Sequence, residues 1–309
     1  MAFITYTMQI IMSFLMLTMI SVMLPRAAVS ANRINEVIET DISISDKENA
    51  SENAITEGRV CFDDVSFRYG DADADVLEHI SFTAEPGQTT AIIGSTGSGK
   101  STLINLIPRF FDVTSGKITV DGTDVRDMSQ KHLRSKIGLV PQKGVLFSGT
   151  IATNLRFGNK NATDAEIAEA AEIAQATEFI ESKPERYETP VAQGGTNVSG
   201  GQKQRLSIAR AIAKKPKIYI FDDSFSALDF KTDAALRKAL SEKLGDSTVL
   251  IVAQRISTII NAEKIIVLDD GKIAGIGTHK ELMENCDVYR QIAYSQLSEA
   301  ELNGSKEGE

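Results

Sequence analysis

Hydrophobic positions are continuous in the first part of the chain and periodic afterwards. From Ala2 to Leu24 the sequence carries no charge and is mostly Ile, Leu, Met and Phe. About 20 apolar residues are enough to cross a bilayer as a helix, so this run predicts a transmembrane helix. A secretory signal peptide and a buried helix of a soluble domain are the alternatives. The run is too long for a signal peptide and has no basic region before it, and no other segment is suited to cover it on all sides.

Positive charge flanks this apolar run on one side only. Arg26 and Arg33 follow it, whereas no Lys or Arg precedes it. Because cytoplasmic flanks carry the excess of positive charge, everything after Leu24 is predicted to lie in the cytoplasm.

Helical spacing continues past the apolar run and then stops. Ala27, Ala31, Ile34 and Ile38 recur at the helical period. The residues from Ser43 to Glu57 are polar and have no period, which predicts a linker of low structure. The chain is therefore divided into a membrane helix with its extension (1–40), a linker (41–58), a globular domain (59–297) and a polar tail (298–309).

Short apolar runs, most of them nearly uninterrupted, fill the globular domain. They predict strands over residues 59–69, 77–84, 88–93, 117–122, 137–142, 217–223, 248–253, 264–268 and 272–276. Buried strands that alternate with helices are typical of an α/β fold with a mostly parallel sheet. The second of these strands is expected to pair back on the first, and Asp270-Gly271 predicts a hairpin turn between the last two.

One stretch of the globular domain, residues 150–187, carries no strand pattern. Thr163-Asp-Ala-Glu166 is a capping box in front of an Ala-rich helix over 165–176. Another helix with an apolar stripe is expected within residues 197–212. These features predict a separate helical subdomain over about 150–215.

Charge and cysteine content narrow the range of ligands. The formal net charge is −9, and the basic residues form no tract. Binding to a phosphate backbone needs clustered Lys and Arg, so nucleic acid is not expected as a partner. The two cysteines, Cys61 and Cys286, are far apart and lack metal-ligand spacing, which predicts reduced thiols.

The most specific motif in the sequence is the loop Gly94-Ser-Thr-Gly-Ser-Gly-Lys-Ser-Thr102, which matches G-x-x-x-x-G-K-[ST]. Its glycines let backbone N–H groups point at a phosphate chain. Lys100 supplies charge for the terminal phosphates, and the Ser101 hydroxyl can coordinate Mg²⁺. A strand before the loop and a helix after it favour a nucleoside triphosphate site over a flexible loop. The predicted binding residues here are Gly94, Ser95, Thr96, Gly97, Ser98, Gly99, Lys100, Ser101 and Thr102.

Other candidate residues follow predicted strands or open a helix. The strand over 217–223 ends in Asp222 and Asp223. An Asp that an apolar strand delivers beside a phosphate loop usually holds Mg²⁺. Gln142 ends another strand near the expected nucleotide, and the glycines of Val198-Ser-Gly-Gly-Gln202 open a helix, where anions bind.

Together, the phosphate loop, the Val198–Gln202 run and the Phe221-Asp-Asp-Ser-Phe-Ser-Ala-Leu-Asp229 run resemble the nucleotide-binding domain of ATP-binding-cassette (ABC) transporters. The resemblance is to exporters that fuse membrane and ATPase regions in one chain. It covers about Arg59 to Leu297, and the apolar helix is similar to the last of six membrane helices of a half-transporter. It implies a P-loop NTPase fold with an antiparallel β subdomain and a helical subdomain, preceded by one transmembrane helix.

The resemblance assigns a role to each matching residue. Tyr69 matches the aromatic side chain that stacks on adenine, and the run from Ser226 to Asp229 matches a loop that crosses the dimer interface. Gln142 matches a glutamine that contacts magnesium and senses the membrane domain. The implied magnesium ligands are Ser101, Gln142 and Asp222. The signature residues, which in this family contact the ATP of the other subunit, are Ser199, Gly200, Gly201 and Gln202.

Two catalytic positions depart from the family pattern. Asp223 stands where a glutamate usually polarises the attacking water, and Gln254 stands where a histidine usually contacts the γ-phosphate. Aspartate is one methylene shorter, and a misplacement of about 1 Å can cost roughly a hundredfold in rate. Glutamine can donate a hydrogen bond but cannot become a cation. We therefore expect a site, with Asp223, Gln254 and Gln142 as its catalytic residues, that binds ATP and Mg²⁺ and hydrolyses ATP slowly.

The family geometry implies a partner for this chain. Two such domains enclose two ATP molecules, and each site combines one chain's phosphate loop with the other's signature. The chain resembles the weak-site subunit of heterodimeric bacterial multidrug exporters, so the expected partner is a different half-transporter with intact glutamate and histidine. A homodimeric exporter with modest ATPase activity is the alternative.

The resemblance also implies a place in the cell. The intact protein is expected to cross the plasma membrane several times, with its ATPase domain in the cytoplasm, and to export a small molecule, lipid or peptide. Because the chain has room for one of the six helices, it is expected to be a fragment or a truncated product.

Two other functions compete with export. A soluble ABC ATPase of DNA repair or translation is disfavoured by the acidic charge and by the apolar helix. An ATP-binding regulatory module with little turnover is compatible with Asp223 and Gln254.

Overall fold

The computed structural model describes residues 1–52, 55–70 and 72–296. It divides into two compact units, residues 1–45 and the remainder of the chain. Asp71 and the predicted polar tail over 298–309 lie outside the described residues.

The first unit is the helix α1, Ala2–Ile38, which continues through Pro25. Every residue of α1 is exposed within the structure. Among the described helices, α1 alone is long and apolar enough to cross a membrane. Hydroxyls of Thr7, Ser13, Thr18 and Ser21 donate to backbone carbonyls four residues earlier, so their polar groups are satisfied within the helix. The single continuous helix confirms the helical reading of both the apolar run and its extension.

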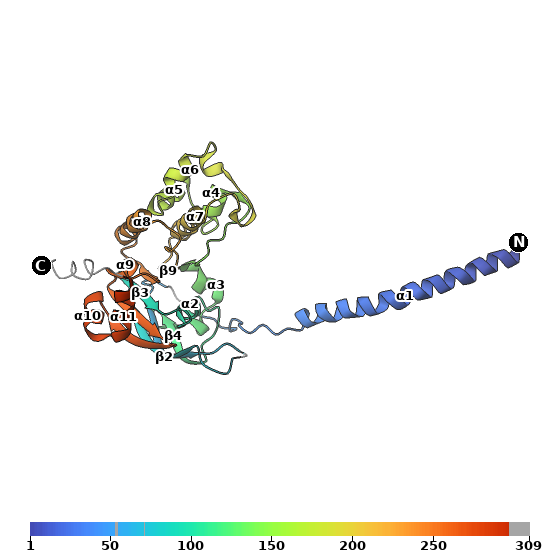
Figure 1. The fold of residues 1–309 in the computed structure, drawn as a ribbon, viewed down its shortest axis with the longest axis horizontal. Helices are drawn as coiled ribbons and strands as arrows, with labels where there is room; N and C mark the ends of the chain where they lie inside the picture. The colour runs from blue at the N-terminus through green and yellow to red at the C-terminus, as the bar shows by residue number, and fades with distance from the viewer. Residues whose placement is uncertain (53–54, 71, 297–309) are drawn as a thin grey trace. The chain divides into compact units, whose positions relative to one another are not determined.

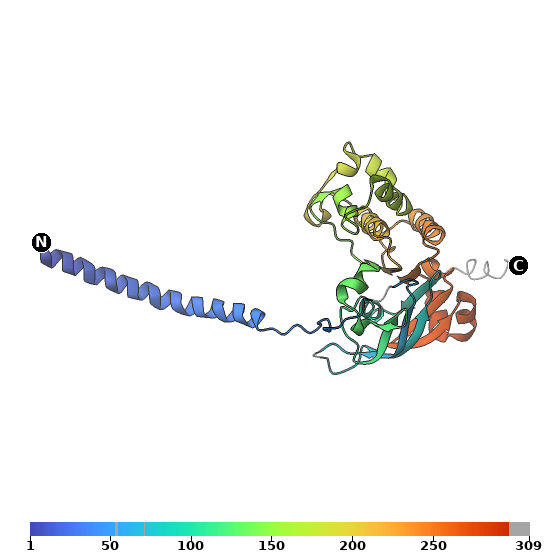
Figure 2. The same cartoon turned by 180° about the vertical axis from the view of Figure 1, so that it is seen from behind.

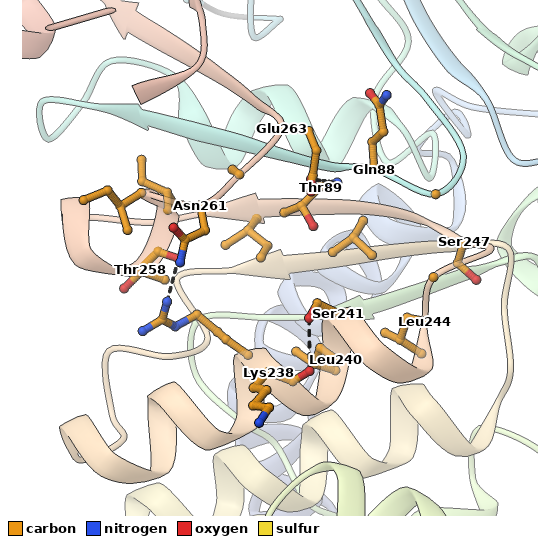
Figure 3. A pocket seen from close by; sticks show the side chains of 18 of the residues that line it. Gln88, Thr89, Lys238, Leu240, Ser241, Leu244, Ser247, Thr258, Asn261 and Glu263 are labelled. Atoms are coloured by element: carbon orange, nitrogen blue, oxygen red, sulfur yellow. Dashed lines mark hydrogen bonds between the residues drawn. The ribbon is translucent and has the colours of Figure 1, made fainter. Parts of the chain in front are cut away.

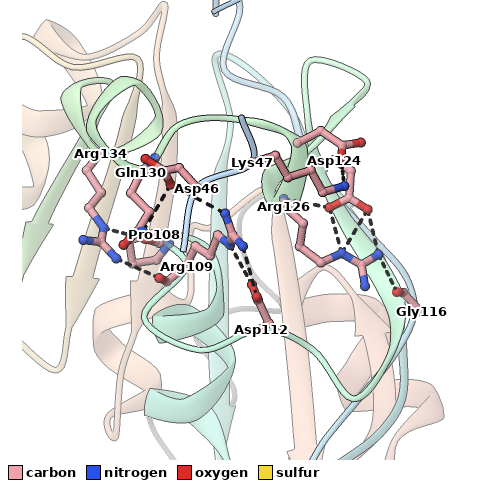
Figure 4. A network of polar contacts seen from close by, with 11 residues as sticks. Asp46, Lys47, Pro108, Arg109, Asp112, Gly116, Asp124, Arg126, Gln130 and Arg134 are labelled. Carbon is pink, nitrogen blue, oxygen red and sulfur yellow. Dashed lines mark hydrogen bonds and ion pairs between the residues drawn. The ribbon is translucent and has the colours of Figure 1, made fainter. Parts of the chain in front are cut away.

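The predicted linker contains neither helix nor strand in its described residues, but Asp46 and Lys47 within it are anchored to other residues of the globular unit. The Asp46 carboxylate accepts hydrogen bonds from the Gln130 backbone (3.0 Å) and side chain (3.1 Å) and lies 3.8 Å from the guanidinium of Arg109 (Figure 4). Lys47 pairs with Asp127. The described linker residues thus have the low regular structure that was predicted, while contacts with distant residues hold Asp46 and Lys47 without any local period.

A second anchor lies at the end of the linker. The Asp121 carboxylate accepts the backbone N–H groups of Thr56, Glu57, Gly58 and Arg59 at 2.8–3.2 Å. Ile55, just before them, is only 4% exposed. One carboxylate thus fixes four successive residues at the entrance to the first strand.

A six-stranded sheet forms the centre of the globular unit, in the order β12-β11-β3-β10-β9-β6 (Figure 1). All neighbouring pairs are parallel except β11–β12. The strands are β3 (Thr89–Gly94), β6 (Ile137–Val140), β9 (Ile218–Asp222), β10 (Thr248–Val252), β11 (Lys264–Asp269) and β12 (Lys272–Gly277). The mostly parallel sheet and the hairpin at Asp270-Gly271 are as the sequence predicts.

Both faces of this sheet are buried, which explains why its strands are apolar without alternation. Alternate residues of one strand belong to different cores: Tyr219 and Phe221 face one, and Ile218 and Ile220 face the other. Each core therefore receives half of every central strand.

The second core is closed by an antiparallel sheet of order β2-β1-β4-β5. Its strands are β1 (Val60–Phe67), β2 (Leu77–Ala84), β4 (Ser115–Val120) and β5 (Thr123–Asp124). The helix α2 (Lys100–Leu106) contributes Leu103, Ile104 and Leu106 to the same core, and α3 (Gln130–Ser135) contributes Leu133. The strand over 77–84 pairs back on β1 as expected.

The first core is covered by a helical lobe (Figures 1 and 2). Its helices are α4 (Ile151–Arg156), α5 (Asp164–Ile173), α6 (Thr177–Glu181) and α7 (Gly200–Ala213). The capping box of Thr163 and Glu166 forms as predicted, but α5 ends before residue 176, at a turn where Gln175 has φ 55°. The prediction that residues 150–187 contain no strand is wrong at the first residue, Thr150. Thr150 pairs with Pro190 in a two-stranded sheet made of β7 (Gly149–Thr150) and β8 (Pro190–Val191).

The remaining helices follow the sheet's later strands. They are α8 (Phe230–Lys243), α9 (Ile256–Ile259), α10 (His279–Asn285) and α11 (Asp287–Gln296). The sequence analysis did not define these four. Cys61 and Cys286 are both free thiols.

Candidate nucleotide-binding site

The Gly94–Thr102 loop leaves β3 at the carboxyl edge of the six-stranded sheet and enters α2 at Lys100. Glycine is required at three of its positions. A Cβ on Gly94 would lie 2.1 Å from the Leu268 carbonyl oxygen, and Gly97 (φ 87°) and Gly99 (φ 94°) have left-handed conformations. The loop therefore takes a shape that other residues would disrupt.

Lys100 lies at the centre of this loop. Its Nζ donates to the carbonyl oxygens of Gly94 (3.0 Å) and Ser95 (2.6 Å). Burial lowers the pKa of Lys100, while the charges of Asp222 and Asp223 oppose that shift. A partly desolvated ammonium attracts phosphate more strongly than one in water.

Asp222 ends β9 and faces the same loop. Its Oδ1 accepts the hydroxyl of Ser101 at 3.0 Å. Burial raises the pKa of Asp222; the Ser101 hydrogen bond opposes this shift, and the charge of Asp223 adds to it. The structure thus brings together two of the residues predicted to hold magnesium.

Asp223 lies at the next position, where the chain turns with φ 45°. Its side chain is buried, and its Oδ2 accepts two amide donors: Nε2 of Gln142 at 3.0 Å and Nε2 of Gln254 at 2.7 Å. The three residues predicted to be catalytic therefore meet on one oxygen. Gln142 follows β6 and Gln254 follows β10, so neighbouring strands of the sheet deliver all three.

Tyr69 lies at the other end of the loop region. Its hydroxyl is 3.1 Å from Oγ1 of Thr102, and its ring makes edge contacts with Phe67 and Phe111. The ring is 38% exposed, so one side can receive a planar ligand.

A cavity of about 270 Å³ lies between the phosphate loop and the three residues Gln142, Asp223 and Gln254. Tyr69, Gly94, Ser95 and Ser98 are not among its lining residues, and two apolar lining residues, Val76 and Val252, were not predicted from the sequence. Its lining residues are Val76, Thr96, Gly97, Gly99, Lys100, Ser101, Thr102, Gln142, Asp222, Asp223, Val252 and Gln254. A larger cavity, about 520 Å³, lies between α8, β10 and the chain after α9, and contains none of the predicted residues (Figure 3). The smaller cavity is the candidate site because the loop, the lysine and the carboxylates converge there.

The predicted signature residues lie elsewhere, at the start of α7. Ser199 caps this helix by accepting the N–H of Gln202, and Gly200 is its first residue. Ser199 and Gly200 are exposed, and none of the four signature residues lines the cavity around Lys100. Their surface is thus available to a molecule outside the chain.

The donor set suits magnesium that arrives with phosphate. Magnesium prefers oxygen ligands and is usually held by one or two carboxylates together with phosphate oxygens. Asp222, Ser101 and Gln142 offer such oxygens in one cavity. Among the described residues, no cluster of three or more His, Cys, Asp and Glu could hold a metal alone.

Comparison with known proteins agrees with this geometry. Residues 77–226, which include the phosphate loop, the signature and the two aspartates, match the model of the family described as "ABC transporter". This domain belongs to the ABC transporter family. It has the P-loop fold predicted from the sequence.

Relatives of this ABC transporter chain are about twice its length. An uncharacterized ABC transporter ATP-binding protein of Mycobacterium tuberculosis is 48% identical over 308 residues, which are 98% of this chain and 52% of the relative. A putative multidrug export ATP-binding/permease protein of Staphylococcus aureus is 45% identical over 257 residues, 83% of this chain and 44% of the relative. The chain therefore spans about half the length of the curated relatives it matches.

A solved structure shows the same fold. The structure of a bacterial Atm1-family ABC exporter with ATP bound superimposes with a TM-score of 0.84 at 35% identity, covering 92% of this chain and 50% of that one. The match extends beyond the residues of the family model, so the fold likeness is not confined to the ATP-binding motifs.

Proposed function

We propose that this chain is the ATP-binding subunit of an ABC exporter whose own ATP site binds nucleotide well and hydrolyses it slowly. The observation that carries the proposal is the contrast within one cavity. The loop, Lys100, Ser101 and Asp222 form a complete phosphate- and magnesium-binding set, whereas the carboxylate beside them, Asp223, is short and tied to two amides.

Each part of the cavity has a separate role in the proposal. The residues Gly94 to Thr102 hold the phosphates of ATP, and Tyr69 stacks on adenine. Ser101, Asp222 and Gln142 hold Mg²⁺, which neutralises charge on the phosphates. Asp223 is left to polarise the attacking water, which a base can do only within about 2.6–3.2 Å.

Slow turnover follows from the position of Asp223. Its side chain ends one methylene short of a glutamate, and both Gln142 and Gln254 donate to the same oxygen. These two hydrogen bonds hold the carboxylate in place, so its oxygen is not free to turn toward an attacking water. Gln254 offers a neutral amide, so it adds no positive charge against the γ-phosphate.

The partner is proposed to be a second half-transporter, different in sequence, with glutamate and histidine at the corresponding positions. The exposed residues Ser199 and Gly200, with Gly201 and Gln202, would complete the partner's site, and the partner's signature would complete this one. The exposed run around Ser226 and Asp229 supports a second contact across the interface. A homodimer with two weak sites is the alternative.

The membrane part of the proposal rests on α1 and on the names of the relatives. We infer that residues 1–40 form the last membrane helix of an exporter, that residues 59–297 form its cytoplasmic ATPase domain, and that the intact protein crosses the plasma membrane several times. The exported compound would be a small molecule, lipid or peptide. The name of the Staphylococcus aureus relative, a putative multidrug export protein, supports a small molecule as the exported compound.

The test is to measure ATP affinity and steady-state hydrolysis for the parent chain and for Asp223→Glu combined with Gln254→His. The parent should bind ATP but turn over well below about 1–10 s⁻¹. The double variant should restore turnover by at least about tenfold, with affinity nearly unchanged. Lys100→Ala serves as the blank for contaminating ATPase activity.

Each result separates two functions. A nearly silent parent whose double variant is active would establish an intact pocket that lacks its catalytic pair, and a partner chain would then be sought by co-purification. A parent that turns over briskly would overturn the weak-site proposal and favour the homodimer. A parent that does not bind ATP would overturn the nucleotide site itself.

A further inference from the structure

The C-terminal helix α11 reaches the residues that follow β10 through one side chain, Gln296. Nε2 of Gln296 donates to the carbonyl oxygen of Gln254 at 2.8 Å. Its Oε1 accepts the backbone N–H of Ile256 at 2.9 Å. One side-chain amide thus bridges both ends of the Gln254–Ile256 turn, and no family motif quoted above includes it.

The helix that carries Gln296 is firmly held. Tyr289 is fully buried, and its hydroxyl lies 2.8 Å from Nδ1 of His279 on α10. Ala293, one turn further on, is also fully buried and shares a core with Ile256 of α9. Because α11 packs against both α9 and β11, the helix that carries Gln296 is held against the sheet.

The turn itself has few other restraints near Gln254. Gln254 and Arg255 are exposed, whereas Ile256 is fully buried. The side chain of Gln254 nevertheless reaches Oδ2 of Asp223 at 2.7 Å. A side chain can be aimed reliably only if its backbone is held, and the bond from Gln296 is made to the carbonyl of that same residue.

We propose that Gln296 is a positioning residue that holds the Gln254 turn against the nucleotide cavity, so that α11 sets where the Gln254 side chain points. The inference rests on the proposed function of this cavity. It concerns the backbone of the turn, so it applies equally when residue 254 is a histidine. The matched control is Gln291, an exposed glutamine on the same helix.

Two readouts on the full chain test the proposal. The first is hydrogen–deuterium exchange of the Ile256 amide, which Gln296→Ala should accelerate by about tenfold because its acceptor is lost. The second is single-turnover ATP hydrolysis in the Asp223→Glu, Gln254→His background. There Gln296→Ala should lower the rate by about tenfold, since an offset of a fraction of an ångström already slows a positioned reaction.

Controls separate positioning from general stability. In Gln296→Ala, ATP affinity should stay within about twofold of the background protein, and the thermal midpoint should stay within a few degrees of it. Gln291→Ala should change neither the exchange at Ile256 nor the single-turnover rate. Gln296→Glu keeps an acceptor for Ile256 but places a carboxylate oxygen against the Gln254 carbonyl. It should therefore preserve slow exchange at Ile256 while it still lowers the rate.

The proposal is overturned if either the exchange or the single-turnover rate of Gln296→Ala equals that of the Gln291→Ala control. It is also overturned if affinity and thermal midpoint fall together with the rate, because Gln296 would then only stabilise the fold. A background protein that binds ATP but shows no effect of Gln296 refutes this inference alone. A background protein that fails to bind ATP refutes the proposed function, while the exchange readout still decides whether Gln296 holds the turn.

Discussion

The two sides of the nucleotide cavity differ in how completely they are equipped. On one side, Gly94 to Thr102 and Asp222 provide glycines, an ammonium, a hydroxyl and a carboxylate with mutual contacts near 3 Å. On the other side, the buried Asp223 carboxylate accepts hydrogen bonds from the amides of Gln142 and Gln254. Gln254 is neutral, so it supplies no positive charge at its position. Under the proposed function, holding ATP and cleaving it are the tasks of separate residues, so one can weaken while the other persists.

The largest expected effect is on the holding side. Lys100→Ala removes the ammonium from the loop and should weaken ATP binding by about a hundredfold, as expected for losing one partner of a desolvated charge pair. Isothermal titration with a non-hydrolysable analogue measures it. Lys117→Ala, an exposed lysine paired with Asp63, is the control and should bind normally. Equal affinity of both variants would remove Lys100 from the site.

The next prediction separates the two sides directly. Asp223→Asn keeps the shape of the side chain but cannot accept a proton, so the residual single-turnover rate should fall about tenfold. ATP affinity should change little, because the holding residues are untouched. If affinity falls as much as the rate does, the proposed division between holding and cleaving is wrong.

The Mg²⁺ dependence of ATP binding should report the protonation of Asp222 as the pH falls. Magnesium binds the ionised carboxylate, and burial raises the pKa of Asp222 above its ordinary value. The Mg²⁺-dependent part of ATP affinity should therefore be complete near neutral pH. It should begin to disappear, on acidification, at a higher pH than an ordinary aspartate would give. Titrations at several pH values, with and without Mg²⁺, measure this, and Asp222→Asn should lose the Mg²⁺-dependent part at every pH.

The smallest expected effect concerns Gln142. Gln142→Ala removes one of the two amide donors that hold the Asp223 carboxylate. Because the second donor, Gln254, remains, and Gln142 also offers an oxygen to magnesium, we expect only about a threefold lower rate. Lys143→Ala, at the exposed position beside it, is the control. A tenfold increase would mean that Gln142 restrains turnover.

Sequence alone predicted the parts of the molecule that local pattern encodes. The loop at Lys100, the strand ending at Asp222 and the capped helix at Ser199 all lie where their spacing places them. The family-model match and the ATP-bound exporter agree with the fold these motifs predicted. The roles of Tyr69 and of the signature remain predictions, since they require a ligand or a second chain.

The remainder could not be predicted because it depends on contacts between distant residues. Nothing local in the sequence indicates that Asp121 would bind the N–H groups of residues 56–59, and the Gln296 bridge to Gln254 spans 42 positions. The short strand at Thr150 forms only because Pro190 lies beside it. Such contacts follow from the finished fold, in which sheet neighbours bring together segments that have no common period.

The Asp121 anchor also has a mechanical meaning. A pull on the chain at residue 45 passes through the contacts of Asp46 and then through four amides held by one carboxylate, before it reaches β1 at Val60. The load thus reaches the four-stranded sheet through Asp121, which lies between β4 and β5. Since β1 leads at its far end to Phe67 and Tyr69, tension along this tether and the seating of an aromatic base against Tyr69 would act on the same strand.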